Sequence, residues 1–401
     1  LPHTFTANTA AKASEVNANF EYLLKRFKLR TTTINCYSDS IQDALKEYNH
    51  IKVSGYCNQK VLIGLRGVAS SSQQQINRDF IFIEGLDANK GTTITSTNDA
   101  VIDIDDTVTV RLKNLTVSGG DYGIAVGRGA TLYAQSLKVE NAANSGIAVH
   151  EGGVAWLGDV TVSATSNAVS VTRNSTAKIF NNSLLQNSNT VLRVDYGSHA
   201  QVDNSTLSSN GVIIVALTNS TVNITNSSLT SSSERVIYSR GGVALDIDNT
   251  IITGNSSKEA VQLNDGSTLQ ISGSTVSGGK TGISAVYNST VRLQGGNTIT
   301  GNAQHGIHLL NSTLHQYSDA GTTTISSNTG SEIRADRSFL SLDGVTITGT
   351  GGSTEVDLRY GSLLMLGSGS SVTGTVTCGN TASDNGSFVN NSGTSVTTSG
   401  C

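Results

Sequence analysis

Between positions 150 and 196 the chain carries a group of side chains that could act as acids, bases or charge stabilisers. The group comprises His150, Glu151, Arg173, Arg193, Asp195 and Tyr196. A base beside a cation could remove a proton and stabilise the resulting carbanion, as in a lyase, whereas an inverting hydrolase needs two carboxyl groups about 6.5 to 9.5 Å apart. His150, Arg193 and Asp195 are therefore the candidate catalytic residues.

Carboxylates are concentrated in the stretch DIDD at positions 103 to 106. Asp103, Asp105 and Asp106 could begin a Ca2+ site, which needs about six to eight oxygen ligands, and Asp121 could join them. Charge that protects the edge of an early strand is the alternative interpretation, and we favour it. No other cofactor is predicted.

Aromatic and histidine side chains suggest two further kinds of site. Tyr133 and the only tryptophan, Trp156, could stack on sugar rings or lie in a subunit interface. His305, His308 and His315 could suggest a metal site, but His308 falls in a column that is otherwise apolar and His315 in an outward-facing one. A shared set of metal ligands is therefore not expected.

An internal repeat places these residues. A turn signal of the type [Gly/Asn]-Ser-Thr recurs every 22 to 26 residues. Its anchors are Thr107, Gly129, Gly152, Asn174, Gly197, Asn219, Gly242, Gly266, Asn288, Asn311, Arg337 and Gly361. The position three residues after every anchor is apolar, and apolar pairs two residues apart, before and after the anchor, have the period of a strand. Each repeat therefore predicts three short strands of a solenoid.

A polar column stands seven residues after the anchor, where most repeats have Asn, Ser, Asp or Gly. These residues tolerate left-handed backbone or bond the local backbone. Asn181, Asn204, Asn226 and Asn249 occupy this corner in consecutive repeats. Side-chain amides stacked about 4.8 Å apart could bond one another along the axis, so the column predicts an asparagine ladder.

The ladder and the three-strand repeat resemble the right-handed parallel β-helices of the pectate-lyase-like superfamily, over roughly residues 80 to 370. The resemblance implies an all-β solenoid of about 12 rungs, three strands per rung, that forms a rod about 50 to 60 Å long. It does not imply one function, because lyases, hydrolases, phage tailspikes and adhesins share the fold.

Repeat length bears on the function. Enzymes that resemble this fold place catalysis on the strand before the anchor, beneath long loops, yet no anchor spacing here exceeds 26 residues. His150 is expected two rungs, about 10 Å, from Asp195. Arg128, Glu151 and Arg173 precede successive anchors and are interpreted as a solvated charge ladder. The sequence thus favours a structural or adhesive protein, and a lyase or glycoside hydrolase acting on an acidic polysaccharide is the alternative.

Cysteine pairs stand near both ends of the chain. Cys36 with Cys57 and Cys378 with Cys401 predict two disulfides and an oxidising compartment. Between the first pair, Ser40 and Asp43 form a helix-capping signal before an apolar helical stripe. This segment resembles the helix that plugs the first coil in many secreted bacterial β-helix proteins. The expected organisation is a cap over 36–80, a β-helix over 81–370 and a second cap over 371–401.

Residues 1–35 are predicted to hold an extended segment and an amphipathic helix. Val16, Phe20, Leu23 and Phe27 begin a heptad seam that stops at Arg30. The stretch KASEVNANF resembles the start of mature secreted proteins in many bacteria. The helix could extend the cap by packing on its own rod, or pair with copies of itself in a homo-oligomer. Residues 1–10 could be a disordered tail or a strand donated to a neighbour.

Composition excludes several partners. Charged residues make up 14% of the chain and the net charge is −4, so a nucleic-acid surface is not expected. No apolar run is long enough for a membrane span. The chain opens on Leu1, which suggests a removed leader, although a trimmed chain would look the same. We expect a secreted, non-catalytic subunit of a homo-oligomeric surface fibre or filament, with polysaccharide as the candidate ligand.

Overall fold

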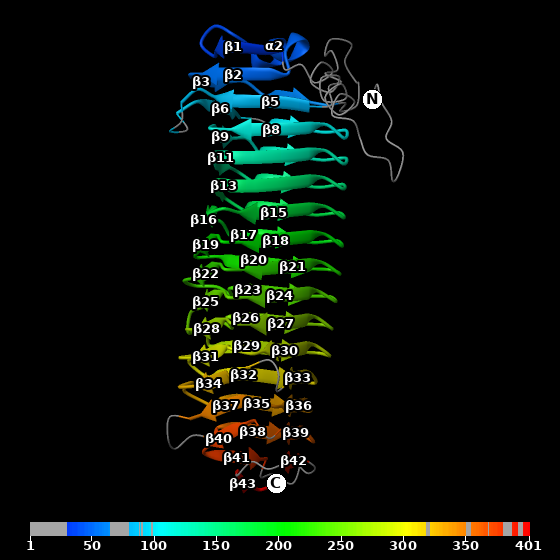
Figure 1. The fold of residues 1–401 in the computed structure, drawn as a ribbon, viewed down its shortest axis with the longest axis vertical. Coiled ribbons are helices and arrows are strands. Elements are labelled where there is room, and N and C mark those ends of the chain that lie inside the picture. The colour runs from blue at the N-terminus through cyan, green and yellow to red at the C-terminus, as the bar shows by residue number, and fades with distance from the viewer. Residues whose placement is uncertain are drawn as a thin grey trace, which may run out of the picture.

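The computed structural model describes residues 30–64, 80–87, 89, 91–97, 99–317, 321–349, 354–367, 369–379, 387–391 and 396–401. Over these residues the chain winds into a parallel β-helix of about 14 turns, which Figure 1 shows from the side. The predicted all-β solenoid is confirmed. The predicted N-terminal seam of Val16, Phe20, Leu23 and Phe27 lies outside the described residues.

One wall of the helix is a single parallel sheet of 15 strands, called sheet 1 here. Its strands are β4 (Val61–Ile63), β7 (Ala100–Ile104), β10 (Tyr122–Val126), β12 (Ser145–Val149), β14 (Asn167–Val171), β17 (Thr190–Val194), β20 (Val212–Leu217), β23 (Ile237–Arg240), β26 (Val261–Asn264), β29 (Thr281–Val286), β32 (His305–Leu310), β35 (Ile333–Asp336), β38 (Val356–Arg359), β41 (Thr375–Cys378) and β43 (Thr397–Ser399).

The other strands form sheet 2, whose 28 strands make two faces. The first face comprises β1 (Thr31–Asn35), β2 (His50–Ser54), β5 (Phe80–Gly85), β8 (Thr109–Lys113), β11 (Thr131–Ala142), β13 (Val154–Ala164), β15 (Thr176–Phe180), β18 (His199–Asp203), β21 (Thr221–Thr225), β24 (Ala244–Asp248), β27 (Thr268–Ser272), β30 (Thr290–Gln294), β33 (Thr313–Gln316), β36 (Phe339–Leu342), β39 (Leu363–Leu366) and β42 (Phe388–Asn391). The second face comprises β3 (Tyr56–Asn58), β6 (Thr93–Ser96), β9 (Thr116–Gly119), β16 (Leu184–Gln186), β19 (Thr206–Ser209), β22 (Ser228–Ser231), β25 (Ile251–Thr253), β28 (Thr275–Ser277), β31 (Thr298–Thr300), β34 (Thr323–Ser326), β37 (Val345–Thr348) and β40 (Ser371–Thr373).

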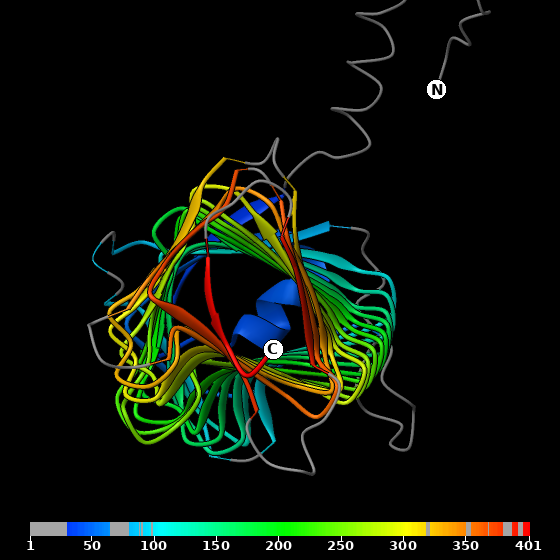
Figure 2. The same cartoon turned by 90° about the horizontal axis from the view of Figure 1, so that it is seen from below.

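The two faces of sheet 2 join where β11 and β13 continue around the corner. Strand β11 pairs with both β8 and β9, and β13 pairs with both β15 and β16. Viewed along the axis, the three walls enclose a triangular interior (Figure 2).

Aliphatic side chains fill that interior, because alternate residues of each short strand point inward. Val222, Ile224 and Leu229 belong to one coil and are fully buried, as the repeat predicts. Each stacks on equivalent side chains of the neighbouring coils, so that Val222 pairs in register with Ala200 and Leu245. A sequence rich in Ser, Thr and Asn therefore still builds one continuous apolar core.

A short helix and two disulfides occupy the ends. Helix α2 (Ile41–Glu47) begins after Ser40, whose side chain accepts a hydrogen bond from the Asp43 backbone N–H at 3.2 Å. Ile41 and Leu45 are fully buried against the N-terminal coils. The Cys36–Cys57 and Cys378–Cys401 disulfides are both present, as predicted. No helix in the described ranges is long and apolar enough to cross a membrane.

The turn count exceeds the predicted 12 because the coils run into both segments that were predicted as caps. Strands β2, β3 and β4 lie within residues 36–80, and β41 and β43 lie within residues 371–401. β43 pairs with β41, which pairs with β38. The missed N-terminal coils lack the [Gly/Asn]-Ser-Thr anchor, whereas the C-terminal one has the near variant Gly386-Ser387 before β42, which the count of 12 did not include.

The asparagine corner is confirmed as a left-handed turn, but the predicted amide ladder is wrong. Asn181, Asn204, Asn226 and Asn249 have φ angles between 44° and 57°, and their side chains are exposed. The side-chain N–H groups of Asn204 and Asn226 donate to the side chains of Asn182 and Asp203 rather than to each other.

The ladder that does form is buried and lies one residue further along the chain. The backbone N–H of each member donates to the side-chain oxygen of the next, at 3.0 to 3.4 Å. Its members are Ser205, Ser227, Thr250, Ser274 and Asn297. A left-handed residue turns the backbone, and the following hydroxyl then points inward and satisfies a buried N–H group of the coil before it.

Candidate functional site

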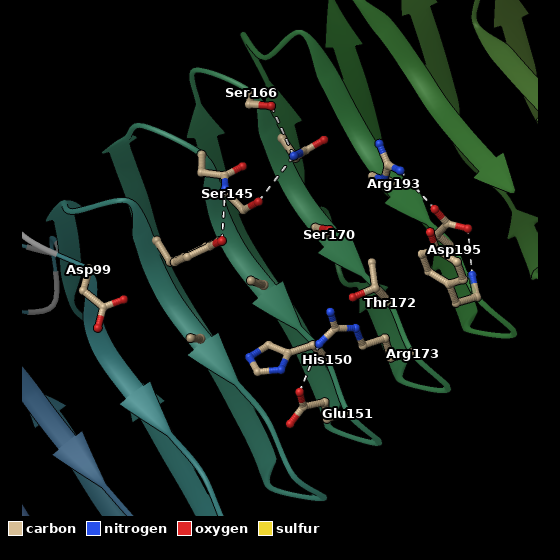
Figure 3. A pocket seen from close by; sticks show the side chains of 16 residues that line it. Asp99, Ser145, His150, Glu151, Ser166, Ser170, Thr172, Arg173, Arg193 and Asp195 are labelled. Carbon is tan, nitrogen blue, oxygen red and sulfur yellow. Dashed lines mark hydrogen bonds and ion pairs between the residues drawn. The ribbon is translucent and has the colours of Figure 1, made fainter. Parts of the chain in front are cut away.

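A shallow groove of about 560 Å³ runs along the outer face of sheet 1 (Figure 3). Its floor is made of small side chains, because Ala125, Ala148 and Ser170 occupy the same outward position in β10, β12 and β14. The next residue in this column is Arg193 of β17. Small residues on three neighbouring strands therefore open a hollow that larger side chains would fill.

The two long edges of the groove are formed by turns. At the start of the strands, the Asn144 side chain donates to the Tyr122 hydroxyl at 3.0 Å, and the Asn167 side chain donates to Ser145 and Ser166. These residues line the groove, and the sequence analysis did not select them.

At the ends of the strands, Glu151, Arg173 and Tyr196 project from successive turns, each with left-handed backbone. An Arg173 guanidinium nitrogen (Nη1) lies 3.0 Å from a Glu151 carboxylate oxygen, and Arg128 Nε lies 3.8 Å from the other oxygen. Their side chains are largely exposed. The predicted charge ladder is therefore confirmed, and it forms one bank of the groove.

Asp195 has a structural environment rather than a catalytic one. It is 2% exposed, and its Oδ2 lies 3.0 Å from the Arg193 guanidinium. Its Oδ1 accepts the Tyr196 backbone N–H at 2.8 Å. Both oxygens are thus used to hold the turn and to orient Arg193, which leaves the carboxylate poorly placed to activate a substrate or a water molecule.

His150 lines the groove without a partner that would orient it. Its ring lies over Gly127, where a β-carbon would stand 2.7 Å from His150 Cε1 and 2.6 Å from Asp105 Oδ1. The ring makes no hydrogen bond with any residue in the described part of the chain. Thr172 separates His150 from Asp195 in the column (Figure 3), as the sequence predicts. The groove thus brings His150, Arg193 and Asp195 onto one surface without forming a base and its orienting acid.

The acidic stretch at the upper end of the groove is buried or paired. Asp103 and Asp105 are 4% exposed, and Arg128 lies 4.0 Å from Asp105 and 3.7 Å from Asp106. Within the described ranges, no three His, Cys, Asp or Glu side chains gather closely enough to hold a metal ion. The geometry therefore gives no support to Ca2+ binding, the interpretation that the sequence did not favour for these residues.

Tyr133 and Trp156 lie on the first face of sheet 2, away from the groove. They are 43% and 37% exposed, and their rings are 6.1 Å apart between centroids and nearly parallel. Lys178, on the next strand, places its ammonium 5.4 Å from the Trp156 ring. This exposed stack suits a flat apolar partner, so its role in recognition or in an interface stays a prediction.

A second group of ionisable side chains occurs on sheet 1 nearer the C-terminus. The sequence suggested His305 and His308 only as metal ligands, which were not expected, and did not connect them with Asp336 or Arg334. His308 Nε2 and Arg334 Nε each lie 3.1 Å from Oδ2 of the buried Asp336. The His305 ring centroid is 5.9 Å from that of His308. A base, its orienting carboxylate and a cation therefore meet on β32 and β35.

The placement of His308 in an apolar column was wrong. His308 pairs in register with Ser284 and Arg334 and belongs to an outward column. The turn that follows β32 is one residue shorter than the turn that follows β29, because Val286 pairs with Leu310 whereas Thr290 pairs with Thr313. Counting back from the anchor therefore misplaced β32 by one residue and exchanged its inward and outward faces.

Less than half of the chain matches a known protein family. A family model described as "Right handed beta helix region" matches residues 100–257. No curated protein matches the chain. Similar solved structures include the Dettilon tailspike protein, at 10% identity over 95% of this chain and 71% of that chain, with a TM-score of 0.44.

Two enzymes also appear among the similar structures. A variant of the PL6 family alginate lyase AlyGC has 9% identity over 91% of this chain and 76% of that chain, with a TM-score of 0.42. The A-module of the Azotobacter vinelandii mannuronan C-5 epimerase AlgE4 has 13% identity over 92% of this chain and 99% of that chain, with a TM-score of 0.34. At such identities these likenesses assign no activity or ligand to this chain.

Proposed function

We propose that this protein is an extracellular, non-catalytic β-helix that binds polysaccharide along the sheet 1 groove as a structural or adhesive component. The groove is open along the rod, has a floor of small side chains, and has banks that carry Arg173, Tyr196 and Asn144. Such a surface can take an extended chain, with hydroxyl groups on the polar bank and a sugar face against tyrosine.

The observation that carries this proposal is the environment of Asp195 and His150, the acid and base candidates in the groove. Both Asp195 oxygens are occupied by Arg193 and by the Tyr196 backbone N–H, and His150 has no orienting partner in the described part of the chain. Between residues 99 and 196 the turns along the groove are short and uniform, so none of these turns encloses a substrate and excludes water. Binding needs neither feature.

Affinity electrophoresis through gels that contain acidic or neutral polysaccharides tests the binding. Arg173→Ala and Tyr196→Ala should each weaken retardation by roughly tenfold, the loss expected for a contact at the centre of a site. Arg240→Ala is the matched control, because Arg240 is also an exposed arginine paired with a carboxylate, Asp265, but lies outside the groove. Equal retardation of all three variants and the wild type would contradict the proposal.

We further propose that the N-terminal segment joins copies of this chain into a fibre or filament at the cell surface. The heptad seam of Val16, Phe20, Leu23 and Phe27 is the basis of this proposal. Light scattering should give a multiple of the 41.7-kDa chain mass, and a chain without residues 1–30 should be monomeric. A full chain that is already a monomer would refute it.

A polysaccharide lyase or hydrolase acting on an acidic polysaccharide is the second candidate function. The arrangement of His308, Asp336 and Arg334 favours it. If His308 Nε2 carries the hydrogen donated to Asp336, then Nδ1 is a basic nitrogen in a fixed ring, and Arg334 lies beside it to stabilise a developing anion.

Ultraviolet absorbance of unsaturated sugars, measured after incubation with acidic polysaccharides, separates lyase activity from binding, and a reducing-end assay detects hydrolysis. Turnover that His308→Ala or Arg193→Ala abolishes would establish an enzyme and overturn the non-catalytic assignment. Binding without any product from the panel supports it. Because His308 and Arg193 lie at different places on the rod, the variant that loses turnover also identifies the site.

A further inference from the structure

Two successive turns of the β-helix are one residue shorter than the turns on either side of them. These are the turns from sheet 1 to the first face of sheet 2 that begin at Leu310 and Asp336. The strand register shows the change. Val286 pairs with Leu310 and Thr290 pairs with Thr313, so the turn that spans four residue positions in one coil spans three in the next. The turn from Asp336 to Phe339 also spans three. Full length returns in the next coil, where Asp336 pairs with Arg359 and Phe339 with Leu363.

The lost residue is one of two left-handed positions. The longer turns have two such residues, Tyr287 with Asn288 and Tyr360 with Gly361. The shorter turns have one, Asn311 or Arg337. The corner of the rod therefore protrudes less in two consecutive coils. The coil before them and the coil after them each have a tyrosine in the same turn.

This change leaves a notch of about 940 Å³ in the corner of the rod. Tyr287 and Tyr360 are 54% and 43% exposed and are three coils apart, which corresponds to about 14 Å. Phe339, Thr290 and Thr313 also line it, and the Thr313 hydroxyl donates a hydrogen bond to the Thr290 hydroxyl at 3.1 Å. The notch therefore combines exposed aromatic faces with hydrogen-bonding groups.

Arg337 supplies the charge in the notch. Its guanidinium carbon lies 5.4 Å from the centre of the Tyr360 ring. The neighbouring Arg334 and Arg359 are paired with Asp336 and Asp357, whereas Arg337 has no carboxylate within ion-pair distance in the described part of the chain. Stacking uses the face of the guanidinium and leaves N–H groups at its edge for a planar anion such as a carboxylate.

The two tyrosines adopt a backbone conformation that bulky side chains rarely use. Their φ angles are 55° and 53°, in the left-handed region where Gly, Asn and Asp are the usual residues. In other coils the corresponding position holds Arg128, Glu151, Arg173, Tyr196, Thr218, Gly241 and Asp265. The turn accepts many residue types, so the fold itself does not require a tyrosine at either end of the notch.

We propose that this notch, the Tyr287–Arg337–Tyr360 site, binds an acidic sugar unit of an oligosaccharide. The sugar carboxylate would bond the edge of the Arg337 guanidinium, and the apolar C–H faces of its rings would pack on the tyrosines. Asn311 and the threonine hydroxyls would bond sugar hydroxyl groups. The site is independent of the sheet 1 groove, because β20, β23 and β26 separate β17 at the end of the groove from β29 beside the notch.

Calorimetric titration of the full chain with uronic-acid tetrasaccharides tests this site. The matched ligands are the same tetrasaccharides after reduction of their carboxyl groups to alcohols. The wild type should prefer the acidic form by roughly tenfold, the difference expected for one exposed charged hydrogen-bonded pair. Arg337→Gln should abolish that preference, and Tyr287→Ala or Tyr360→Ala should weaken binding of both forms.

Two controls distinguish this proposal from the groove. Tyr196→Ala removes a tyrosine with the same left-handed backbone from the groove, and Tyr317→Ala removes an exposed tyrosine that does not line the notch. Tyr317→Ala should leave tetrasaccharide binding unchanged. Tyr196→Ala can affect binding in the groove, but it should leave the Arg337-dependent preference for the acidic form unchanged. Binding that depends on Tyr196 but not on Arg337 would assign the ligand to the groove and overturn the notch, as would equal affinity for the acidic and reduced forms or no binding by the wild type.

Discussion

At the scale of single residues, the left-handed position in the turn after sheet 1 determines what the corner of the rod presents. In successive coils it carries Arg128, Glu151, Arg173 and Tyr196, all with positive φ. The backbone fixes the direction of this side chain but not its type, since the chain on either side is held by strand pairing. Charge and aromatic rings can therefore vary along the corner while the core is unchanged.

The first prediction concerns His305. Burial, followed by the nearby His308 and Arg334, lowers the pKa of His305 from its ordinary 6.5 to about 4. Between these two pH values the unfolded chain binds more protons than the folded chain, so the free energy of unfolding falls as the pH falls. His305→Asn should remove this loss, because its side-chain oxygen can still accept the Ser331 N–H that His305 Nδ1 accepts at 3.3 Å.

Denaturant unfolding followed by circular dichroism at pH 7.5, 6.0 and 4.5 measures this effect. The difference in stability between wild type and variant should shift in favour of the variant as the pH falls. Asp336 does not interfere: burial raises its pKa, but hydrogen bonds from His308 and Arg334 outweigh this and hold the pKa below 3.8, so its contribution is lost only in stronger acid. Parallel stability curves for the two proteins would show that His305 titrates normally.

Residue type and spacing predicted where the groove residues lie, but neither the groove itself nor the chemistry within it. The repeat places His150 and Asp195 two strands apart on the same outward column, as found. It cannot show that the Asp195 carboxylate folds back onto the Tyr196 N–H, because that depends on the side-chain conformation in a left-handed turn. The wrong prediction of an amide ladder through Asn204 and Asn226 has the same origin, since side chains that are in register from coil to coil can still point outward.

At the scale of elements, the buried hydroxyl ladder is the feature that lets a polar sequence close tight corners. Ser227 accepts the Ser205 backbone N–H at 3.2 Å and donates to the Thr225 carbonyl at 2.7 Å. Ser205 and Ser227 are almost fully buried, so water does not replace these bonds. Each rung of the ladder thus joins two coils where the backbone leaves its strand.

Ser227→Ala should accordingly destabilise the protein. The substitution leaves the buried Ser205 N–H without an acceptor, which costs about 1 to 3 kcal/mol. Ser256→Ala, at an exposed turn position, is the control and should change the stability by no more than about 0.5 kcal/mol. Urea unfolding of the two variants provides the measurement. Equal stabilities would mean that the ladder hydroxyls do not contribute to holding the coils together.

The elements themselves were largely predictable, and the exceptions are informative. Alternating apolar residues predict the strands, and Ser40 predicts the start of α2. The shortened turns at Leu310 and Asp336 were not predicted. When the repeats are aligned on Asn311 and Arg337, a missing residue changes only the distance between anchors and does not show where in the coil it is missing. Only strand register shows on which side of the anchor the residue was lost, and both the His308 cluster and the notch depend on that information.

At the scale of the whole molecule, the rod is a stack in which each coil contacts its neighbours only. Stability in such a stack is a sum of local terms, so the two ends are its weakest points. At the C-terminal end, β43 pairs with β41 alone in sheet 1, and the last residue is held to β41 by the Cys378–Cys401 disulfide. The interior coils contain no disulfide, since all four cysteines belong to the two end pairs. Each interior coil is instead paired with a neighbour on both sides.

Replacement of Cys378 and Cys401 by serine should therefore unfold the C-terminal end without unfolding the rod. The disulfide spans 23 residues, and closing a loop of this size is worth about 3 kcal/mol. Hydrogen exchange followed by mass spectrometry should show protection lost in β43 and β41, while β18, β21 and β24 keep theirs. Serine replacement of Cys36 and Cys57 is the matched control and should expose the opposite end around β1 and β3. If either double variant lowered protection evenly along the whole rod, the coils would unfold as one cooperative unit, and stability could not be divided among neighbouring pairs.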